Sequence, residues 1–378
     1  MNKIDRSLDV INSTDDLEHL YTFKDFPVFM GCTDAAKETD ILTDMSWWIS
    51  KSSGMVQLTP LIPLEIVYKM SHGSGSIGRI WAEHHLSLAK FISKINPSQV
   101  LEIGGGHGEL SKAFNTLSTA NWTIVEPNPS PVDGVTAEYI KEFFDEKFTI
   151  NLTIDTVVHS HVFEHMYDPD LFMNHLSMFV KPGSKMIFSI PNMQAMLERY
   201  YTNMINFEHT IILTEPFIEF LLAKYGFKVL EKEYFLDDHS IFYATERLEI
   251  SNPITLPTNL YNKNKELFIK WVEHLTDFIN ILNATIASTD KPIYLFGAHV
   301  FSQHLIALGS NTEKIICLLD NDTKKQNKRL YGSDLVVNSP TILKDVTNPL
   351  VILRAGVFSQ EIKRDILENI NPNTEFLL

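Results

Sequence analysis

The chain has 378 residues, 44% hydrophobic and 21% charged, a composition typical of a folded protein with two or three domains. Asp and Glu outnumber Lys and Arg by 47 to 32, and the formal charge of −15 argues against a nucleic-acid backbone as the main partner. Its two cysteines, Cys32 and Cys317, cannot form a disulfide framework or a four-thiolate zinc site, and no apolar run approaches the roughly 18 residues of a membrane span. We therefore expect a soluble cytoplasmic protein whose partner is a small molecule, with no nucleic acid or membrane as partner.

The first part of the chain is irregular, and a regular alternation of strands and helices follows it. Residues 1–75 predict short strands and turns, and residues 76–95 place His84 and several apolar residues at helical spacing. Strands are expected at 100–105, 123–129, 156–163 and 185–192, with helices after the first and the third, and a helix at 214–226 precedes a further strand. Repeated strand–helix units predict an α/β protein with a mostly parallel sheet and helices on both faces.

A second, smaller α/β unit is expected at the carboxyl end. Residues 251–258 carry two prolines and are typical of a linker, and the following stretch predicts a helix that packs one domain against another. After Asp290 a new strand–helix series begins. The predicted division is therefore 1–75, 76–250, 251–289 for the linker and packing helix, and 290–378.

The most informative segment is a glycine-rich turn between a strand and a helix. It begins with an acid, Glu102, and continues through four glycines, Gly104, Gly105, Gly106 and Gly108. Glycines at this position let the backbone approach a ligand closely. A second acid, Glu126, ends the next strand, where a carboxylate can accept hydrogen bonds from ribose hydroxyls. No lysine follows the glycines, which excludes a nucleoside-triphosphate loop.

These segments resemble the class I S-adenosylmethionine-dependent methyltransferases. The resemblance rests on VLEIGGGHGELS, TIVEPNP and the stretch DTVVHSHVFEHMYDPDLFMNHLSMFVKPGSKMIFSIPN. It implies a central Rossmann-like domain that binds S-adenosylmethionine, with S-adenosylhomocysteine as the product. The glycines would pass under the methionine part of the cofactor, and Glu126 with Pro127 would lie at the ribose.

The resemblance also implies roles for residues further along the chain. Phe143 would lie against the adenine, the alternative being an ordinary core phenylalanine, and His161 would line the cofactor pocket. The pair Glu164–His165 recurs across the family whatever the substrate, so we interpret it as structural.

The arrangement of the whole chain resembles the three-domain C-methyltransferases that act on nucleotide-linked sugars. Those enzymes have a small zinc-binding domain first and a smaller Rossmann-like domain last. Here Ser50-Lys51-Ser52-Ser53-Gly54 stands where the family has Cys-x-x-Cys-Gly, and serine is a poor zinc ligand. We therefore expect no metal in this chain, and a first domain held by an aromatic core that includes Trp47 and Trp48.

Within that family an acid–base pair follows the fifth strand in a Tyr-x-Glu-His pattern. The matching residues are Asn206-Phe207-Glu208-His209, so Glu208 and His209 carry over and the tyrosine is replaced by Phe207. An imidazole suits removal of the acceptor's proton, and a neighbouring carboxylate can assist it. His84 is a third catalytic candidate, the alternative being a partly buried histidine with satisfied hydrogen bonds.

We expect an enzyme that methylates a small activated metabolite at oxygen or carbon. A nucleotide-linked or phosphorylated sugar, or a related phosphoryl compound, is the expected acceptor, in surface-polysaccharide (capsule) or other carbohydrate or secondary-metabolite biosynthesis. Two alternatives stay open: an NAD-dependent oxidoreductase that uses the carboxyl-terminal Rossmann-like domain, and an inactive cofactor-binding partner of another enzyme.

Overall fold

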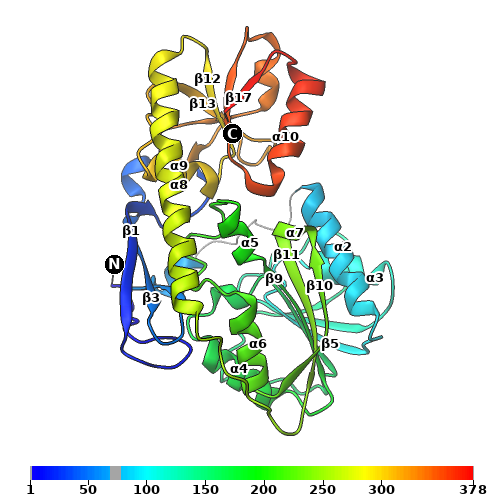
Figure 1. Cartoon of the computed structure of the whole chain (residues 1–378). Coiled ribbons are helices and arrows are strands. Elements are labelled where there is room, and N and C mark those ends of the chain that lie inside the picture. Colours follow the sequence, from blue (N-terminus) through cyan, green and yellow to red (C-terminus); the bar gives the residue numbers. More distant parts are fainter. Residues whose placement is uncertain (1, 69–77, 378) are drawn as a thin grey trace.

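The computed structural model describes residues 2–68 and 78–377, which form three main sheets (Figure 1). The first is an antiparallel sheet in the order β1-β3-β4. Alternate residues of β3 line its inner face, so that Met45, Trp47 and Ile49 are fully buried, as the two-residue period of a strand requires. Trp47 thus lies in the core, whereas Trp48 is half-buried and packs its ring against His19. The elements of this part are β1 (Leu17–Pro27), β2 (Cys32–Thr33), η1 (Lys37–Thr39), β3 (Leu42–Ser50), β4 (Val56–Leu58) and α1 (Leu64–Val67).

The turn that replaces the expected zinc ligands is held by hydrogen bonds to an aspartate. Ser50 Oγ donates to Asp16 Oδ1 over 3.0 Å, and the Ser52 backbone N–H donates to Asp16 Oδ2 over 2.7 Å. Cys32 lies elsewhere, with its Sγ 3.5 Å from the Ala298 carbonyl oxygen.

The second sheet has seven strands in the order β10-β11-β9-β8-β5-β6-β7. The strands from β9 to β7 in this order run parallel, and β11 is antiparallel to both of its neighbours. Successive residues of a strand face opposite sides, so Val100 packs in one core with α2 and α3, and Leu101 in another with α4 and α6. The elements are α2 (Arg79–Ser93), β5 (Gln99–Ile103), α3 (Glu109–Asn115), β6 (Asn121–Val125), β7 (Glu138–Ile140), β8 (Thr156–Ser160), η2 (Phe163–His165), α4 (Pro169–Phe179), β9 (Lys185–Pro191), α5 (Met193–Glu198), α6 (Glu215–Lys224), β10 (Phe227–Phe235), α7 (Leu236–His239) and β11 (Ser240–Arg247).

The third sheet is parallel, in the order β15-β13-β12-β16-β17. Short strands β2 and β14 pair with each other and so connect the first part of the chain to the last. The elements are β12 (Ile293–Phe296), α9 (Val300–Ala307), β13 (Ile315–Leu319), β14 (Arg329–Leu330), β15 (Val337–Asn338), η3 (Pro340–Asp345), β16 (Leu350–Leu353), η4 (Gly356–Phe358), α10 (Ser359–Asp365), η5 (Ile366–Ile370) and β17 (Glu375–Leu377).

The long helix α8 (Leu260–Ser288) connects the sheets (Figure 1). Phe268 and Trp271, in its first half, lie in the core that contains β1 and β3, and Phe278 and Leu282, in its second half, lie in the core of the third sheet. In the described residues, no helix, α8 included, combines the length and low charge that a membrane crossing needs.

The expected α/β class with a mostly parallel central sheet is confirmed, but several elements differ from the expectation. The strand expected at 156–163 ends at Ser160, because His161 adopts a left-handed backbone with φ 54°. The antiparallel strand β11 and the helix α5 were not anticipated. The basic residues of the loop after β13 are largely paired with acids, as Arg329 is with Asp40.

Substitution of Trp271 tests whether α8 holds the sheets together. Its ring is fully buried, and its Nε1 donates to the Tyr201 carbonyl over 2.8 Å. Trp271→Ala is expected to lower the free energy of unfolding by about 3–5 kcal/mol, because it leaves a cavity and an unpaired carbonyl. Lys270→Ala, on the exposed side of the same turn, is expected to cost less than about 0.5 kcal/mol. Denaturant unfolding of both variants checks this, and equal shifts would contradict it.

Candidate functional site

The glycine-rich turn follows β5 at the carboxyl-terminal edge of the central sheet. Gly104 and Gly108 have φ values of 72° and 73°, which favour glycine. Gly108 is the residue directly before α3. A Cβ on Gly105 would lie 2.7 Å from Glu102 Cδ, whereas a Cβ on Gly106 would meet nothing within 4 Å. The turn is therefore packed against the protein on one side and open at Gly106, which fits the close approach of a ligand.

Glu102 lies beneath this turn. Its side chain is 3% exposed, and Oε2 accepts a hydrogen bond of 2.7 Å from Trp122 Nε1. Burial raises the pKa of Glu102 to about 7, partly offset by the Trp122 hydrogen bond, and the Glu126 charge adds to the rise.

Glu126 lies directly after β6 and faces the turn. Its Oε2 is 3.3 Å from the Gly106 backbone N, which donates to it, and Oε1 accepts from the Asn128 backbone N–H over 2.9 Å. Glu126 and Pro127 are partly exposed, so the two predicted acids lie on opposite sides of the glycine backbone. A ligand can reach Glu126 from solvent, whereas Glu102 is covered by the turn.

Phe143 lies on the surface after β7, with 46% of its side chain exposed. The alternative of a core phenylalanine is therefore wrong. The neighbouring Phe144 takes the packing role instead, with its ring 5.4 Å from Phe148 and 5.2 Å from Phe179.

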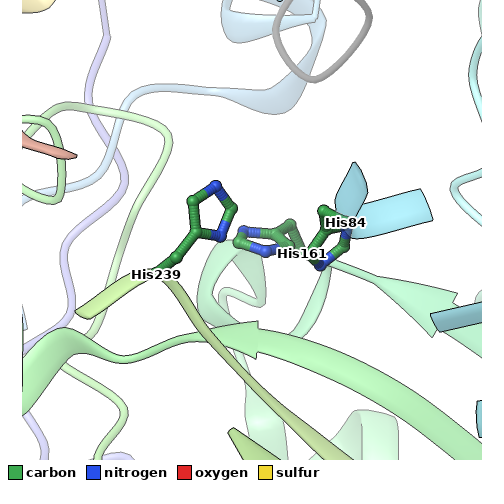
Figure 2. A group of neighbouring side chains, drawn as sticks. All are labelled: His84, His161 and His239. Carbon is green, nitrogen blue, oxygen red and sulfur yellow. The ribbon is translucent and has the colours of Figure 1, made fainter. Parts of the chain in front are cut away.

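His84 and His161 lie together with a third histidine that the sequence analysis did not select, His239 (Figure 2). They come from α2, from the turn after β8 and from the end of α7. Their ring centroids are 5.4 to 6.1 Å apart, and one ring nitrogen of each lies within 4.8 Å of one ring nitrogen of the other two. We call these three residues the histidine cluster.

His84 and His239 are buried and His161 is partly buried, and all three rings contact serine hydroxyls. His84 Nε2 is 2.9 Å from Ser189 Oγ, and Ser240 Oγ is 2.9 Å from His161 Nε2 and 2.7 Å from His239 Nδ1. Burial, with a smaller contribution from neighbouring histidines, lowers the pKa of His161 and His239 to about 3 and that of His84 well below its usual value.

A second cluster contains Glu164, His165 and His209, with one ligand-type atom of each within 4.8 Å of the others. The Glu164 carboxylate is fully buried, and neither oxygen accepts a hydrogen bond from the described residues. Its Oε1 is 3.9 Å from His165 Nε2 and 3.4 Å from His161 Nδ1, so it lies between the two clusters. Burial raises the pKa of Glu164 to about 7, although the nearby His209 counteracts the rise.

The position of His209 fixes its tautomer. Its Nδ1 is 2.8 Å from the Met204 carbonyl oxygen, which can only accept, so Nδ1 carries the hydrogen and the lone pair is on Nε2. The backbone N–H groups of Glu208 and His209 both donate to Asn206 Oδ1, over 2.8 and 2.9 Å, which makes the segment a tight turn and not a strand. The predicted pair is therefore not forced to point in opposite directions.

Glu208 is 5% exposed, and its charge contributes to raising the pKa of Tyr68 and Tyr167, both already raised by burial. Phe207 points into the core, with its ring 6.1 Å from Phe26. Phe207 has no hydroxyl, but a different hydroxyl lies at this cluster, because Tyr68 Oη is 3.1 Å from His165 Nδ1.

All three parts of the chain hold the segment that carries His209. Arg6, 9% exposed, donates to the carbonyl oxygens of Leu58, Tyr167 and Thr210. His304 of α9 donates from Nε2 to the Ile205 carbonyl. The sequence offered no signal for these contacts, because both side chains reach backbone atoms far away along the chain.

A cavity of about 730 Å³ lies between the central and the third sheet. It is lined by Arg199, by residues 236–238 of α7 and by Arg354, Ser359 and neighbours from the third part. Arg199 is paired with Asp238, whereas no carboxylate of the described residues lies within ion-pair distance of Arg354, which packs 4.2 Å from the centre of the Phe278 ring.

Glu102 makes stability depend on pH. Its pKa is about 7 in the folded chain and about 4.5 when exposed, so its contribution is fully present below about pH 4.5 and is lost as the pH rises through about 7. Glu102→Gln keeps an acceptor for Trp122 and does not titrate. We expect the stability of the variant relative to wild type to improve by about 3 kcal/mol between pH 4 and pH 8. Thermal melts at both pH values measure this, and a pH-independent difference would contradict it.

One family of known proteins matches the part of the chain that forms this edge of the sheet. Residues 79–232, less than half of the chain, match the family described as Methyltransferase domain. No curated protein sequence matches the chain.

Several solved structures are similar. The N-methyltransferase NodS from Bradyrhizobium japonicum WM9 is 15% identical, covering 45% of this chain and 97% of its own, with a TM-score of 0.35. The 1,6-didemethyltoxoflavin-N1-methyltransferase from Burkholderia thailandensis is 12% identical, covering 52% and 96%, with a TM-score of 0.40. The magnesium protoporphyrin IX methyltransferase from Synechocystis PCC 6803 is 14% identical, covering 48% and 89%, with a TM-score of 0.34.

The family match covers the glycine turn, both acids that flank it and the histidines after β8. The prediction of an α/β enzyme that uses S-adenosylmethionine is confirmed, and residues 79–232 are similar to a methyltransferase domain.

Proposed function

We propose that this methyltransferase acts on a small anionic metabolite, a nucleotide-linked or phosphorylated sugar or a related phosphoryl compound. The observation that carries the proposal is the arrangement at one edge of the central sheet. An open glycine turn and a buried imidazole–carboxylate cluster lie among the elements that end or begin at this edge. A cavity lined in part by α7 lies beside them, and Arg354 of the third part, which has no carboxylate partner among the described residues, lines its other side. Ligands of open α/β sheets bind at this edge.

The cofactor fits the turn. Gly106 presents open backbone, and the Glu126 carboxylate beside it is partly exposed and suited to accept from two ribose hydroxyls. Glu102 under the turn adds negative charge near an ammonium or a sulfonium group, and the exposed ring of Phe143 is free to cover an adenine. S-adenosylmethionine supplies an electrophilic methyl group, and the residues named here bind and orient it.

His209 is the proposed general base. The free lone pair on its Nε2 can take the proton that the acceptor loses as it attacks the methyl group. The Glu164 carboxylate nearby stabilises the imidazolium that results, because opposite charges attract strongly in a dry site. We therefore assign Glu164 and His165 to the catalytic cluster, in place of the purely structural role expected from the sequence. Glu208, which shares the turn of His209, is a positioning residue for this base.

The charge of the cavity favours an anionic acceptor. Arg354 is largely buried, which lowers its pKa, and it lacks a carboxylate partner among the described residues, so an anionic group that enters the cavity would find an uncompensated cation. The resemblance to nucleotide-sugar enzymes points to the same class, and hence to carbohydrate, capsule or secondary-metabolite biosynthesis. The atom methylated is open to direct test, because an enzyme that methylates carbon should exchange solvent deuterium into the sugar without the methyl donor.

Neither alternative function gains support from a specific contact. In the third part of the chain, Asp320 Oδ2 accepts from the Ala298 backbone N–H over 2.9 Å and lies 3.1 Å from Lys325 Nζ. This carboxylate, which an NAD site would use for ribose, already has internal partners. Absence of NAD(H) binding in an equilibrium titration would dispose of the oxidoreductase. An inactive partner protein would bind the methyl donor and methylate no pathway intermediate.

Substitution of Glu126 tests the proposed cofactor site. Glu126→Gln is expected to weaken binding of S-adenosylhomocysteine roughly 10- to 100-fold, because charge-assisted hydrogen bonds to ribose become neutral ones. Glu142→Gln, an exposed acid just after β7, is the matched control and should leave the affinity within about twofold. Isothermal titration calorimetry measures both, and equal affinities of the two variants would remove Glu126 from the site.

Substitution of His209 tests its proposed role as the general base. His209→Ala is expected to lower kcat roughly 10²- to 10⁴-fold, with the affinity for S-adenosylhomocysteine unchanged. His175→Ala, a half-buried histidine of α4 packed against Phe144, is the control and should keep full turnover. A screen of nucleotide sugars and phosphorylated metabolites by thermal shift supplies the acceptor for the assay. Unchanged turnover of His209→Ala would transfer the role of base to Glu208 or His84.

A further inference from the structure

Three histidines from separate elements converge on one point that the proposed chemistry does not use. His84 comes from α2, His161 follows β8 and His239 precedes β11. The strands bring two of them together, because the His161 backbone N–H donates to the Ser189 carbonyl and Ser240 pairs with Pro191 in the neighbouring strand. Both residues thus sit above the end of β9, and His84 reaches the same place through Ser189 Oγ.

The ring nitrogens are arranged for a ligand. His84 is 0% exposed, and its Nδ1 has no hydrogen-bond partner among the described residues, although its Nε2 is engaged by Ser189. A buried nitrogen without a partner is costly unless something else binds it. The nearest candidates are the other two rings, each of which has one nitrogen within 4.8 Å of the others.

We propose that His84, His161 and His239 bind a divalent transition-metal ion of the zinc type. The three imidazoles have one nitrogen each within 4.8 Å of the others, and these nitrogens must draw closer together to reach metal–nitrogen distances of about 2.0–2.1 Å. Three histidines leave a fourth coordination position for water or for an oxygen of a ligand. This inference departs from the expectation, based on the missing cysteines, that the chain holds no metal.

The surroundings supply the outer shell that metal-bound histidines require. Ser189 Oγ engages His84 Nε2, and Ser240 Oγ engages His239 Nδ1. The Glu164 carboxylate lies 3.4 Å from His161 Nδ1, so His161 would bind the ion through Nε2 and give up its contact with Ser240 Oγ. A carboxylate behind a ligand histidine fixes the ring and increases its basicity. A dication here would also compensate the buried charge of Glu164, which no hydrogen bond of the described residues offsets. Trp81 covers the group, with its ring 4.9 to 5.2 Å from all three imidazoles.

Metal binding can be measured without any assay of methyl transfer. The full chain, stripped with a chelator, is titrated with Co²⁺ in place of Zn²⁺. We expect one ion per chain and the intense visible bands of four-coordinate Co²⁺, which Zn²⁺ then abolishes. Absence of both the bands and any retained zinc by elemental analysis would overturn the proposal.

Variants locate the ion. His84→Ala and His239→Ala are each expected to weaken Co²⁺ binding roughly 100-fold or more, and Glu164→Gln roughly 10-fold. His209→Ala belongs to the other cluster, and His175→Ala to neither, so both should bind Co²⁺ as wild type does. Loss of binding in His209→Ala with full binding in His239→Ala would assign the ion to the second cluster and overturn the proposal.

X-ray absorption of the zinc-loaded wild-type chain covers the case in which a histidine variant fails to fold. The expected signature is three imidazole nitrogen ligands and one further oxygen or nitrogen ligand, all at about 2.0–2.1 Å. A shell with fewer than three imidazoles would contradict the assignment. Because none of these measurements uses S-adenosylmethionine or an acceptor, failure here leaves the proposed methyl transfer untouched.

Discussion

The buried carboxylate of Glu164 is the constraint around which this protein's site is organised. It has no exposed surface and no hydrogen-bond donor among the described residues, yet His161 lies 3.4 Å away on one side and His165 3.9 Å away on the other. An ionised carboxylate in a dry interior is very costly unless a cation approaches it. Burial raises its pKa to about 7, and the nearby His209 counteracts the rise. One acid thus couples a cluster suited to proton transfer with a cluster suited to metal binding.

All three parts of the chain contact the loop that carries His209, which lies beside this acid. The loop that carries His209 lies beyond the central sheet and has little regular structure of its own. Its backbone carbonyls accept hydrogen bonds from Arg6 of the first part and from His304 of the third, and Trp271 of α8 binds the carbonyl of Tyr201 just before it. The proposed base, held from three sides, would keep its orientation, and orientation accounts for much of the rate in a methyl transfer, which requires donor, methyl and acceptor in line.

The last part of the chain lines one side of the cavity between the second and third sheets. α7 contributes residues 236–238 to this cavity and His239 to the histidine cluster, so the two features share one short helix. Arg354, which has no carboxylate partner among the described residues, brings a positive charge to this cavity in a chain whose net charge is −15. Local charge, and not net charge, decides what such a cavity attracts, and the proposed phosphoryl group on the acceptor would suit it.

Sequence alone was enough for the fold class, for most of the alternating strands and helices of the central sheet and for the glycine turn with its two acids, because these depend on local periodicity and on the backbone freedom of glycine. It also selected His84, His161 and His209 individually. The grouping of His84 with His161 and His239, and of His209 with Glu164 and His165, emerged only from the tertiary structure, because the segments that meet are 44 to 155 residues apart in the chain. Antiparallel β11, which the sequence analysis missed, brings His239 to the edge of the sheet, and strand pairing over such separations leaves no periodic signal in the sequence.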